Sequence, residues 1–310
     1  MHYADPEKWE VLVGKQQGRG NTPLNVFMNE VCGESYDSGS KLVTVTDLRK
    51  AACLPWTRDI DEAKKHLNEY TYKIVSVDWG GGGVKGGKSV MEYQSYTAIA
   101  VMGMSPDGKI DVLYGYRSLH PHDHVREAKV ILGVMNHFKC SHLVHDYTGA
   151  GSIRETVMNH AGLPLQNIVP IAYTGPAKGN VLQFKPATGL HPRDHYNMEK
   201  ARSLNYTCQF IKSGALRFFS YDHVDSSEPG LLHDFLYLIE DKTETGFGRD
   251  RYQILRDPAG PDDFAQAVNM GTMMICHMSG NWPNLAQYED ITLGDDAKSA
   301  VTPPKRWDDM

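Results

Sequence analysis

The chain has 310 residues, and its 32 Lys and Arg side chains stand against 38 Asp and Glu side chains, for a formal net charge of -6 at pH 7. This balance excludes a globally basic field, so any binding of nucleic acid must be local or assisted by a partner. The length exceeds that of most single domains and predicts two domains, or one domain with an appendage.

The N-terminal part of the chain differs in pattern from the rest. Residues 1–70 alternate short apolar clusters with turn-rich polar stretches and show no sustained helix or strand period. We expect them to be an appendage that follows an upstream domain. From Tyr72 two β-rich runs, YKIVSVD and SYTAIAVMGM, precede the turn SPDG and a third run, KIDVLYGYR. These runs predict a three-stranded meander.

Helical spacing begins after Pro121. Apolar residues at positions 125, 128, 131, 132, 135 and 138 predict a helix that leads into a fourth strand, HLVHD. A short helix near 153–160 and the apolar segment NIVPIA are expected next, followed by a long helix whose buried stripe begins at Met198 and which Gly214 ends. The segment LLHDFLYLIED is predicted to be helical, RYQILR to be a strand and DDFAQAVNMGTMMICHM to be a final helix. We expect a folded unit over residues 71–280 and a polar tail over 281–310.

The five cysteines are scattered and show no C-x-x-C spacing, which is typical of reduced, mostly buried thiols. We find no signal peptide, no internal repeat and no apolar run of about 18 residues in the sequence. We therefore expect an intracellular protein without a membrane-spanning segment.

The glycine-rich stretch VSVDWGGGGVKGGKS, residues 75–89, allows two interpretations. It matches the phosphate-binding pattern G-x-x-x-x-G-K-[ST] at Gly82, Gly87, Lys88 and Ser89. A phosphate-binding loop works because its glycines lead directly into a helix whose N-terminal N–H groups hold the phosphates. The residues that follow, VMEYQSYTAIAVMGM, predict a strand instead. We therefore interpret the glycines as a connection between strands and Asp78, just before them, as the chemically important residue.

Aspartates stand at three places where strands end or a helix begins. Asp78 ends the first strand, Asp146 ends the fourth, and Asp262 and Asp263 open the last helix. Each one alone has an ordinary explanation as a turn or capping residue. If the first and fourth strands are adjacent and parallel, however, Asp78 and Asp146 emerge at one sheet edge, and the last helix can bring the pair alongside. The joint placement favours a common site.

Carboxylates that crowd together repel one another, and their pKa values rise unless cations neutralise them. Hard oxygen ligands favour Mg²⁺ or Mn²⁺, and two such ions about 3.5 to 4 Å apart can clamp a phosphodiester and activate a water molecule. The sequence therefore predicts a site for two Mg²⁺ or Mn²⁺ ions at these aspartates.

At these residues the chain resembles the C-terminal nuclease domain of the large terminase subunit of tailed bacteriophages, over about 72–278. The resemblance depends on the segments VSVDWGGG, VHDYTGAG, EKARSLNYTCQFIKSGALRF and DPAGPDDFAQAVNMG. It implies an α/β, ribonuclease H-like fold, in which an antiparallel three-strand meander and parallel strands form a mixed β-sheet flanked by helices. It also implies that residues 1–70 are a remnant of the segment after a missing ATPase domain.

The same resemblance assigns roles to the aspartates. Asp78 would be the first metal ligand, Asp146 the second, and the Asp262 and Asp263 pair the third, with Asp263 as the more direct ligand. The implied activity is that of an endodeoxyribonuclease that cuts concatemeric viral DNA. The implied partners are double-stranded DNA and, in a full-length protein, an ATPase motor domain, the small terminase subunit and the portal. The implied location is the host cell cytoplasm, transiently at the procapsid.

A basic segment is the best candidate for contact with DNA phosphates. Between 178 and 217, seven basic residues outnumber two acidic ones. We interpret five of them as DNA-binding and two as an extension of the same strip: Lys178, Lys185, Arg193, Lys200 and Arg202, then Lys212 and Arg217. The alternative is a solvated helix face.

Other motifs carry less weight. His120, His122 and His124 invite a zinc site, but no cysteine is near and a helix starts there, so we interpret them as a capped loop. The segment GAGS around Ser152 does not match the hydrolase pattern G-x-S-x-G. Two alternative functions stay open: an ATPase of the actin and sugar-kinase type, and a non-catalytic docking domain that holds a structural metal.

Overall fold

The computed structural model describes ten stretches of the chain: residues 41–56, 60–80, 95–118, 123–149, 151–175, 179–189, 193–220, 230–245, 249–257 and 260–283. Several predicted features lie outside these stretches. They are Gly82, Gly87, Lys88 and Ser89 of the glycine-rich stretch, His120 and His122, Lys178, Cys32, and most of the expected appendage and tail.

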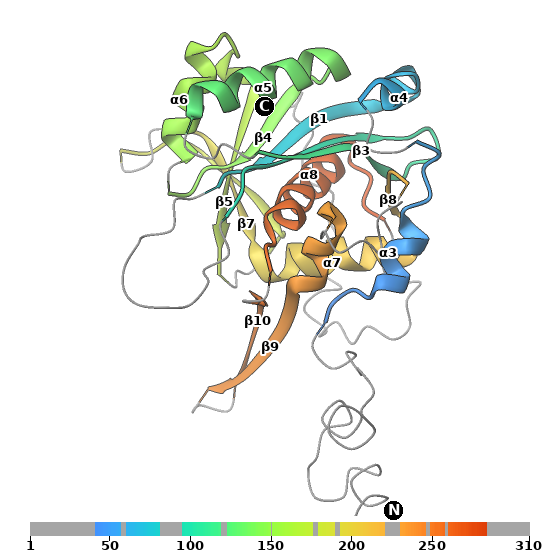
Figure 1. Ribbon diagram of the computed structural model, residues 1–310. Helices are drawn as coiled ribbons and strands as arrows, with labels where there is room; N and C mark the ends of the chain where they lie inside the picture. The colour runs from blue at the N-terminus through green and yellow to red at the C-terminus, as the bar shows by residue number, and fades with distance from the viewer. Residues whose placement is uncertain are drawn as a thin grey trace, which may run out of the picture.

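Eight strands of the described residues form one mixed sheet in the order β6-β7-β5-β4-β1-β2-β3-β8 (Figure 1). Their bounds are β1 (Thr71–Asp78), β2 (Ala98–Met104), β3 (Ile110–Arg117), β4 (His142–Asp146), β5 (Ile168–Thr174), β6 (Leu182–Lys185), β7 (His195–Glu199) and β8 (Leu216–Phe218). β1, β2 and β3 form the predicted antiparallel meander, and β4 pairs with β1 in parallel. β5 and β7 continue the parallel part, and β6 closes it as an antiparallel edge.

Helices cover both faces of this sheet (Figure 1). α5 (His124–Phe138) and α6 (Gly151–His160) lie on one side, and α3 (Val45–Ala51), α7 (Lys200–Ser213) and α8 (Asp263–Ser279) lie on the other. The short helices are α4 (Ile60–Lys64) and the 3₁₀ segments η1 (Leu67–Glu69), η2 (Leu165–Asn167) and η3 (Leu231–Tyr237). The predicted α/β class is confirmed: an antiparallel meander and parallel strands form a mixed sheet between helices. Among the described residues no helix has the length and apolarity needed to cross a bilayer.

α8 is the central helix of the core. Fifteen of its 17 residues are buried, because it packs against β1 and β2. At Gly271 an added Cβ would lie 2.4 Å from the sulfur of Met102 and 3.0 Å from Cβ of Ser76, so glycine permits this close approach. The methionines of this helix belong to the core: Met270, Met273, Met274 and, partly buried, Met278.

Two boundaries differ from the sequence prediction. LLHDFLYLIED is not one helix, because only its first part forms η3, and Leu238 begins strand β9 (Leu238–Thr245). β9 pairs with β10 (Arg249–Arg256) as a two-stranded hairpin that extends away from the main sheet (Figure 1). The long helix begins at Lys200, so Met198 belongs to β7. The predicted end of that helix at Gly214 is confirmed, with a φ of 72° that glycine accommodates.

The described residues before β1 share the core of the sheet. Leu48, Trp56 and Leu67 are buried, and the Trp56 indole Nε1 donates a hydrogen bond to the carbonyl of Leu113 on β3, at 3.1 Å. The packing therefore shows no break near residue 70, where we expected a boundary. The origin of residues 1–70 as a remnant stays a prediction.

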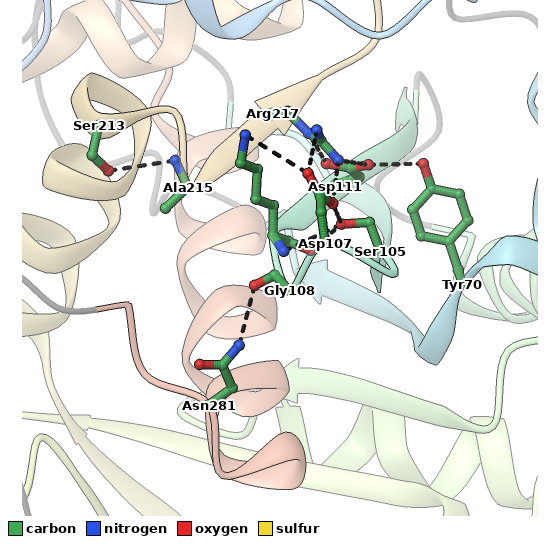
Figure 2. A network of polar contacts seen from close by, with 10 residues as sticks. Tyr70, Ser105, Asp107, Gly108, Asp111, Ser213, Ala215, Arg217 and Asn281 are labelled. Atoms are coloured by element: carbon green, nitrogen blue, oxygen red, sulfur yellow. Dashed lines mark hydrogen bonds and ion pairs between the residues drawn. The ribbon is translucent and has the colours of Figure 1, made fainter.

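A polar network ties this N-terminal segment to the sheet at the end opposite Asp78 (Figure 2). The Arg217 guanidinium on β8 donates to the buried Asp111 on β3, at 2.6 and 2.8 Å, and to Asp107 at 3.1 and 3.2 Å. The Tyr70 hydroxyl donates to Asp111 at 2.8 Å. The Arg217 side chain therefore takes part in internal ion pairs. Asn281, at the start of the expected tail, donates a hydrogen bond to the nearby carbonyl of Gly108.

Candidate functional site

The site lies where parallel strands end. β1 and β4 pair with Val77 opposite His145, so Asp78 and Asp146 follow at neighbouring strand tips. β5 continues beside β4, with Ile171 opposite Asp146. The adjacency that the sequence required for a shared site is therefore present.

The N-terminus of α8 brings the other two aspartates to this edge. The pKa of Asp78 is raised well above its ordinary value, first because the group is buried and then because of the negative charges of Asp263, Asp146 and Asp262, in that order. Lys200 opposes this shift only in part. The other three predicted aspartates thus all act electrostatically on Asp78.

Asp263 is almost completely buried, with 3% of its surface exposed. Its Oδ1 accepts a hydrogen bond from the Ser95 hydroxyl at 2.7 Å, and its carboxylate also binds the backbone N–H of Tyr96. Burial raises the pKa of Asp263, and these two donors work against that rise. Its Oδ2 is buried and has no hydrogen-bond partner among the residues that the structure describes. Such an orphaned carboxylate oxygen costs free energy unless something binds it.

Asp262 occupies the N-cap position of α8, yet its side chain makes no capping hydrogen bond. Its Oδ2 accepts from the Gln266 amide at 2.7 Å, and its Oδ1 lies 4.0 Å from the Arg256 guanidinium. The capping explanation therefore does not account for Asp262.

Asp146 combines a turn role with its place in the site. Its Oδ1 accepts from the backbone N–H and the hydroxyl of Thr148, at 2.8 and 2.6 Å. Helix α6 begins against the same strand tip, because a Cβ at Gly151 would lie only 2.2 Å from the carbonyl oxygen of Asp146. Glycine at 151 therefore lets the helix start close behind the carboxylate.

Two further residues complete the site. Tyr173, near the end of β5, has a raised pKa because of burial and because of the charges of Asp78, Asp146 and Asp262. The Lys200 ammonium lies 5.4 Å from the centre of the Tyr173 ring. Tyr173 was not among the predicted site residues. It could have been, because it stands near the end of the next apolar run, NIVPIAYT, as Asp146 stands at the end of HLVHD.

The donor set suits a hard divalent cation. Carboxylate oxygens favour Mg²⁺ or Mn²⁺, and the raised pKa of Asp78 and the free Oδ2 of Asp263 indicate negative charge that the protein's own cations leave uncompensated. In the described stretches no group of three or more His, Cys, Asp or Glu side chains is already arranged around a metal position. Hydroxyl and amide donors hold Asp146, Asp262 and Asp263 one by one instead.

The basic residues predicted to contact DNA do not form one strip. Lys200 begins α7 at the site edge. Arg202 follows two residues later, and its guanidinium donates to Glu199 and to the carbonyl of Gly179. Lys185 pairs with His195, the first residue of β7, and therefore lies at the opposite end of that strand.

Arg193 also lies at that opposite end. Its guanidinium binds Glu155 at 2.8 Å and the carbonyls of Leu165 and Ile168 at 2.7 and 3.0 Å. These internal bonds use several of its donors. DNA contact by Arg193 and Lys185 stays a prediction that the sheet geometry does not favour.

Comparison with known proteins gives matches in structure only. No protein-family model and no curated protein matches the sequence. The large terminase nuclease from thermophilic phage G20c is 9% identical, with a TM-score of 0.40 over 66% of this chain and 84% of that one.

The nuclease domain of the large terminase subunit of bacterial virus Sf6 is 12% identical, with a TM-score of 0.44 over 74% of this chain and 97% of that one. A mutant of that domain, solved with manganese and beta-thujaplicinol, is 12% identical with a TM-score of 0.45 over the same shares. The structure of this chain is thus similar to those of large terminase nuclease domains.

Proposed function

We propose that this chain is a metal-dependent DNA endonuclease domain of a viral genome-packaging terminase, which cuts concatemeric DNA by hydrolysis of a phosphodiester. The observation that carries the proposal is the electrostatic convergence at one sheet edge, where the charges of Asp263, Asp146 and Asp262 all raise the pKa of Asp78. A protein gains nothing in stability from such a cluster, and perturbed carboxylates of this kind concentrate at functional sites.

Asp78, Asp146 and Asp263 would hold the cations, and Asp262, fixed by Gln266, would add charge beside them. Two bound Mg²⁺ or Mn²⁺ ions supply an activated water and stabilisation of the leaving 3′ oxygen. The Oδ2 of Asp263 is the oxygen most available to bind a cation, because no residue in the described stretches donates a hydrogen bond to it. Lys200 would draw the scissile phosphate toward the carboxylates.

Double-stranded DNA is the proposed substrate, although the net charge of the chain is -6. Contact through Lys200 and Arg202 would be local and would weaken steeply with salt. An attached ATPase motor domain, the small terminase subunit and the portal would supply the local DNA concentration in the host cell and at the procapsid.

The alternative ATPase of the actin and sugar-kinase type would need a second large copy of the sheet. The described stretches hold one eight-stranded sheet and one two-stranded hairpin, so the nuclease is favoured. A docking domain with a structural metal would use the same carboxylates but would leave DNA intact.

A nicking assay tests the proposal. Supercoiled plasmid is incubated with Mn²⁺ or Mg²⁺ and the natural chain, Asp78→Ala, or Asp107→Ala, whose carboxylate lies in the network at the opposite end of the sheet. ATP turnover is measured alongside.

Nicking that EDTA and Asp78→Ala abolish and Asp107→Ala preserves supports the nuclease. ATP turnover without nicking favours the ATPase. Metal binding without either activity favours the docking domain.

A further inference from the structure

The helix that carries the aspartate pair is capped by a residue from another segment. The backbone N–H of Phe264, in the first turn of α8, donates to Oδ2 of Asp234 at 2.8 Å. Asp234 belongs to η3, 30 residues earlier in the chain. An aspartate at the N-cap normally binds the first-turn N–H groups of its own helix, but Asp262 does not.

Asp234 is itself fully buried and paired. None of its side chain is exposed, and its Oδ1 accepts from the Arg117 guanidinium at the end of β3. η3 and α8 reach this position because β3 carries Gly115, where an added Cβ would lie 2.7 Å from Leu231 and 2.8 Å from Phe264. The pair is thus held between three elements.

Arg117 also reaches the segment that binds Asp263. Its guanidinium lies 5.1 Å from the centre of the Tyr96 ring. The backbone N–H of Tyr96 and the hydroxyl of its neighbour Ser95 are the two donors on the Asp263 carboxylate. Arg117 therefore contacts the segment that carries these donors, while its partner Asp234 accepts a hydrogen bond from the backbone of the helix.

This arrangement has a consequence for the site aspartates. If Asp262 capped α8 by itself, its carboxylate would turn toward the backbone N–H groups and away from Asp78. Because Asp234 takes over the cap, Asp262 stays available to the site. The Ser95 hydroxyl binds Oδ1 of Asp263, and none of the described residues binds its Oδ2. Because Asp234 of η3 caps the helix, Asp262 does not need to do so, and its carboxylate can contribute to cation binding.

We propose that Asp234 and Arg117 are positioning residues of the metal site: Asp234 caps α8 in place of Asp262, and Arg117 holds both Asp234 and the segment that orients Asp263. The inference rests on the proposed nuclease function, since it assigns these residues to the same cation site. Residues that orient metal ligands from behind typically change metal affinity by about 10- to 100-fold when they are replaced.

The chain offers a matched control for a test. Asp111 and Arg217 form a second buried Asp–Arg pair, with side-chain exposures of 0% and 20%, against 0% for Asp234 and 16% for Arg117. This control pair (Figure 2) lies at the opposite end of the sheet, because Asp111 pairs with Gly103 near one end of β2, whereas Asp78 pairs with Ala98 at the other. Replacing either aspartate by Asn removes a buried ion pair, so both variants should lose thermal stability, but only one should change the site.

The experiment measures Mn²⁺ affinity by calorimetry, together with thermal unfolding and plasmid nicking. Asp234→Asn keeps an acceptor for the Phe264 N–H and should bind Mn²⁺ about tenfold more weakly, while Asp234→Ala should approach about 100-fold. Raised Mn²⁺ should restore nicking in Asp234→Asn. Asp111→Asn should melt earlier but bind Mn²⁺ as the natural chain does.

Unchanged Mn²⁺ affinity in Asp234→Asn and Asp234→Ala would overturn the positioning role while leaving the nuclease intact. Equal weakening by Asp111→Asn would overturn it too, because the effect would then follow stability alone. A natural chain that binds no Mn²⁺ and nicks no DNA would overturn the proposed function and this inference together.

Discussion

Asp78 is the residue whose environment is hardest to explain without a ligand. Strand-end aspartates are common, but most are solvated, whereas Asp78 is half-buried and surrounded by three other carboxylates. Lys200 compensates only part of this charge. A free energy cost of this kind is expected where function requires it.

This cost predicts a pH dependence of stability. The folded-state pKa of Asp78 is raised by burial and by its neighbours, so between about pH 4 and that raised pKa the folded chain binds a proton that the unfolded chain has released. Stability should therefore fall as pH rises through this range. Asp234 adds to the trend, because burial raises its pKa to about 7.

Asp78→Asn removes the titrating charge and should therefore raise the melting temperature in EDTA by about 2 °C or more near pH 8. The gain should shrink as the pH falls below the raised pKa of Asp78, because the natural residue is then protonated when folded. With added Mn²⁺ the natural chain should have the higher melting temperature of the two, because only the natural residue binds the ion. Melting curves across pH measure this; a variant that is less stable at every pH in EDTA would contradict it.

The basic residues give a second prediction at this scale. Lys200 lies at the site edge and Lys185 at the far end of β7, so Lys200→Ala should weaken binding of a short DNA duplex more than Lys185→Ala. It should also lower the slope of log affinity against log salt by about 0.9. Equal effects of both variants would contradict this prediction and would favour the single DNA-binding strip predicted from the sequence.

The predicted aspartates could be found from the sequence because strand ends and helix starts are local patterns. Asp78, Asp146 and the pair at 262 and 263 each stand beside such a signal. Asp234 could not be found, because its role depends on contact with a helix that starts about 30 residues later. No local pattern distinguishes a cap supplied from another segment.

Among the elements, α6 begins unusually close to the end of strand β4, and Gly151 permits this contact. The backbone carbonyl of Asp146 lies 2.2 Å from the position of a Cβ at Gly151, and a backbone atom cannot move aside as a side chain can. Gly151→Ala should therefore cost about 1–3 kcal/mol of unfolding free energy. It should also weaken Mn²⁺ binding, because it displaces a predicted ligand.

Gly133 in α5 provides the control for this prediction, since an added Cβ there would meet nothing within 4 Å. Gly133→Ala should be neutral or slightly stabilising, because alanine favours a helix interior. Chemical denaturation with Mn²⁺ calorimetry measures both variants. Gly151→Ala with the stability and Mn²⁺ affinity of the natural chain would show that the close approach is unimportant.

The elements also show where local pattern fails. The segment that forms η3 and β9 has helical apolar spacing, but Leu238 pairs with Arg256 and the rest of β9 follows in the hairpin. Pairing between distant residues decided its conformation. By contrast, the meander, α5 and α8 form the predicted elements, because each packs into the same core: α5 buries one face, and β2 and α8 are almost completely buried.

At the scale of the whole molecule, one core joins the residues before β1 to the sheet. Buried Leu48 and Trp56 pack with the sheet, so an expected appendage is in part a structural component of the domain. Length and composition cannot indicate this, because short helices such as α3 and α4 have too few residues to show a period. The central part of the strand order, β4-β1-β2-β3, agrees with the predicted meander and the parallel fourth strand, whereas β6 and β7 were not predicted.

The central claim is that four aspartates from three parts of the chain form one cation site at the rim of the sheet. Anomalous diffraction from crystals grown with Mn²⁺ tests it most directly. We predict Mn²⁺ density between Asp78, Asp146 and Asp263, with Oδ2 of Asp263 as a ligand. Well-ordered carboxylates with no Mn²⁺ density between them, at a Mn²⁺ concentration that supports binding elsewhere, would contradict the account.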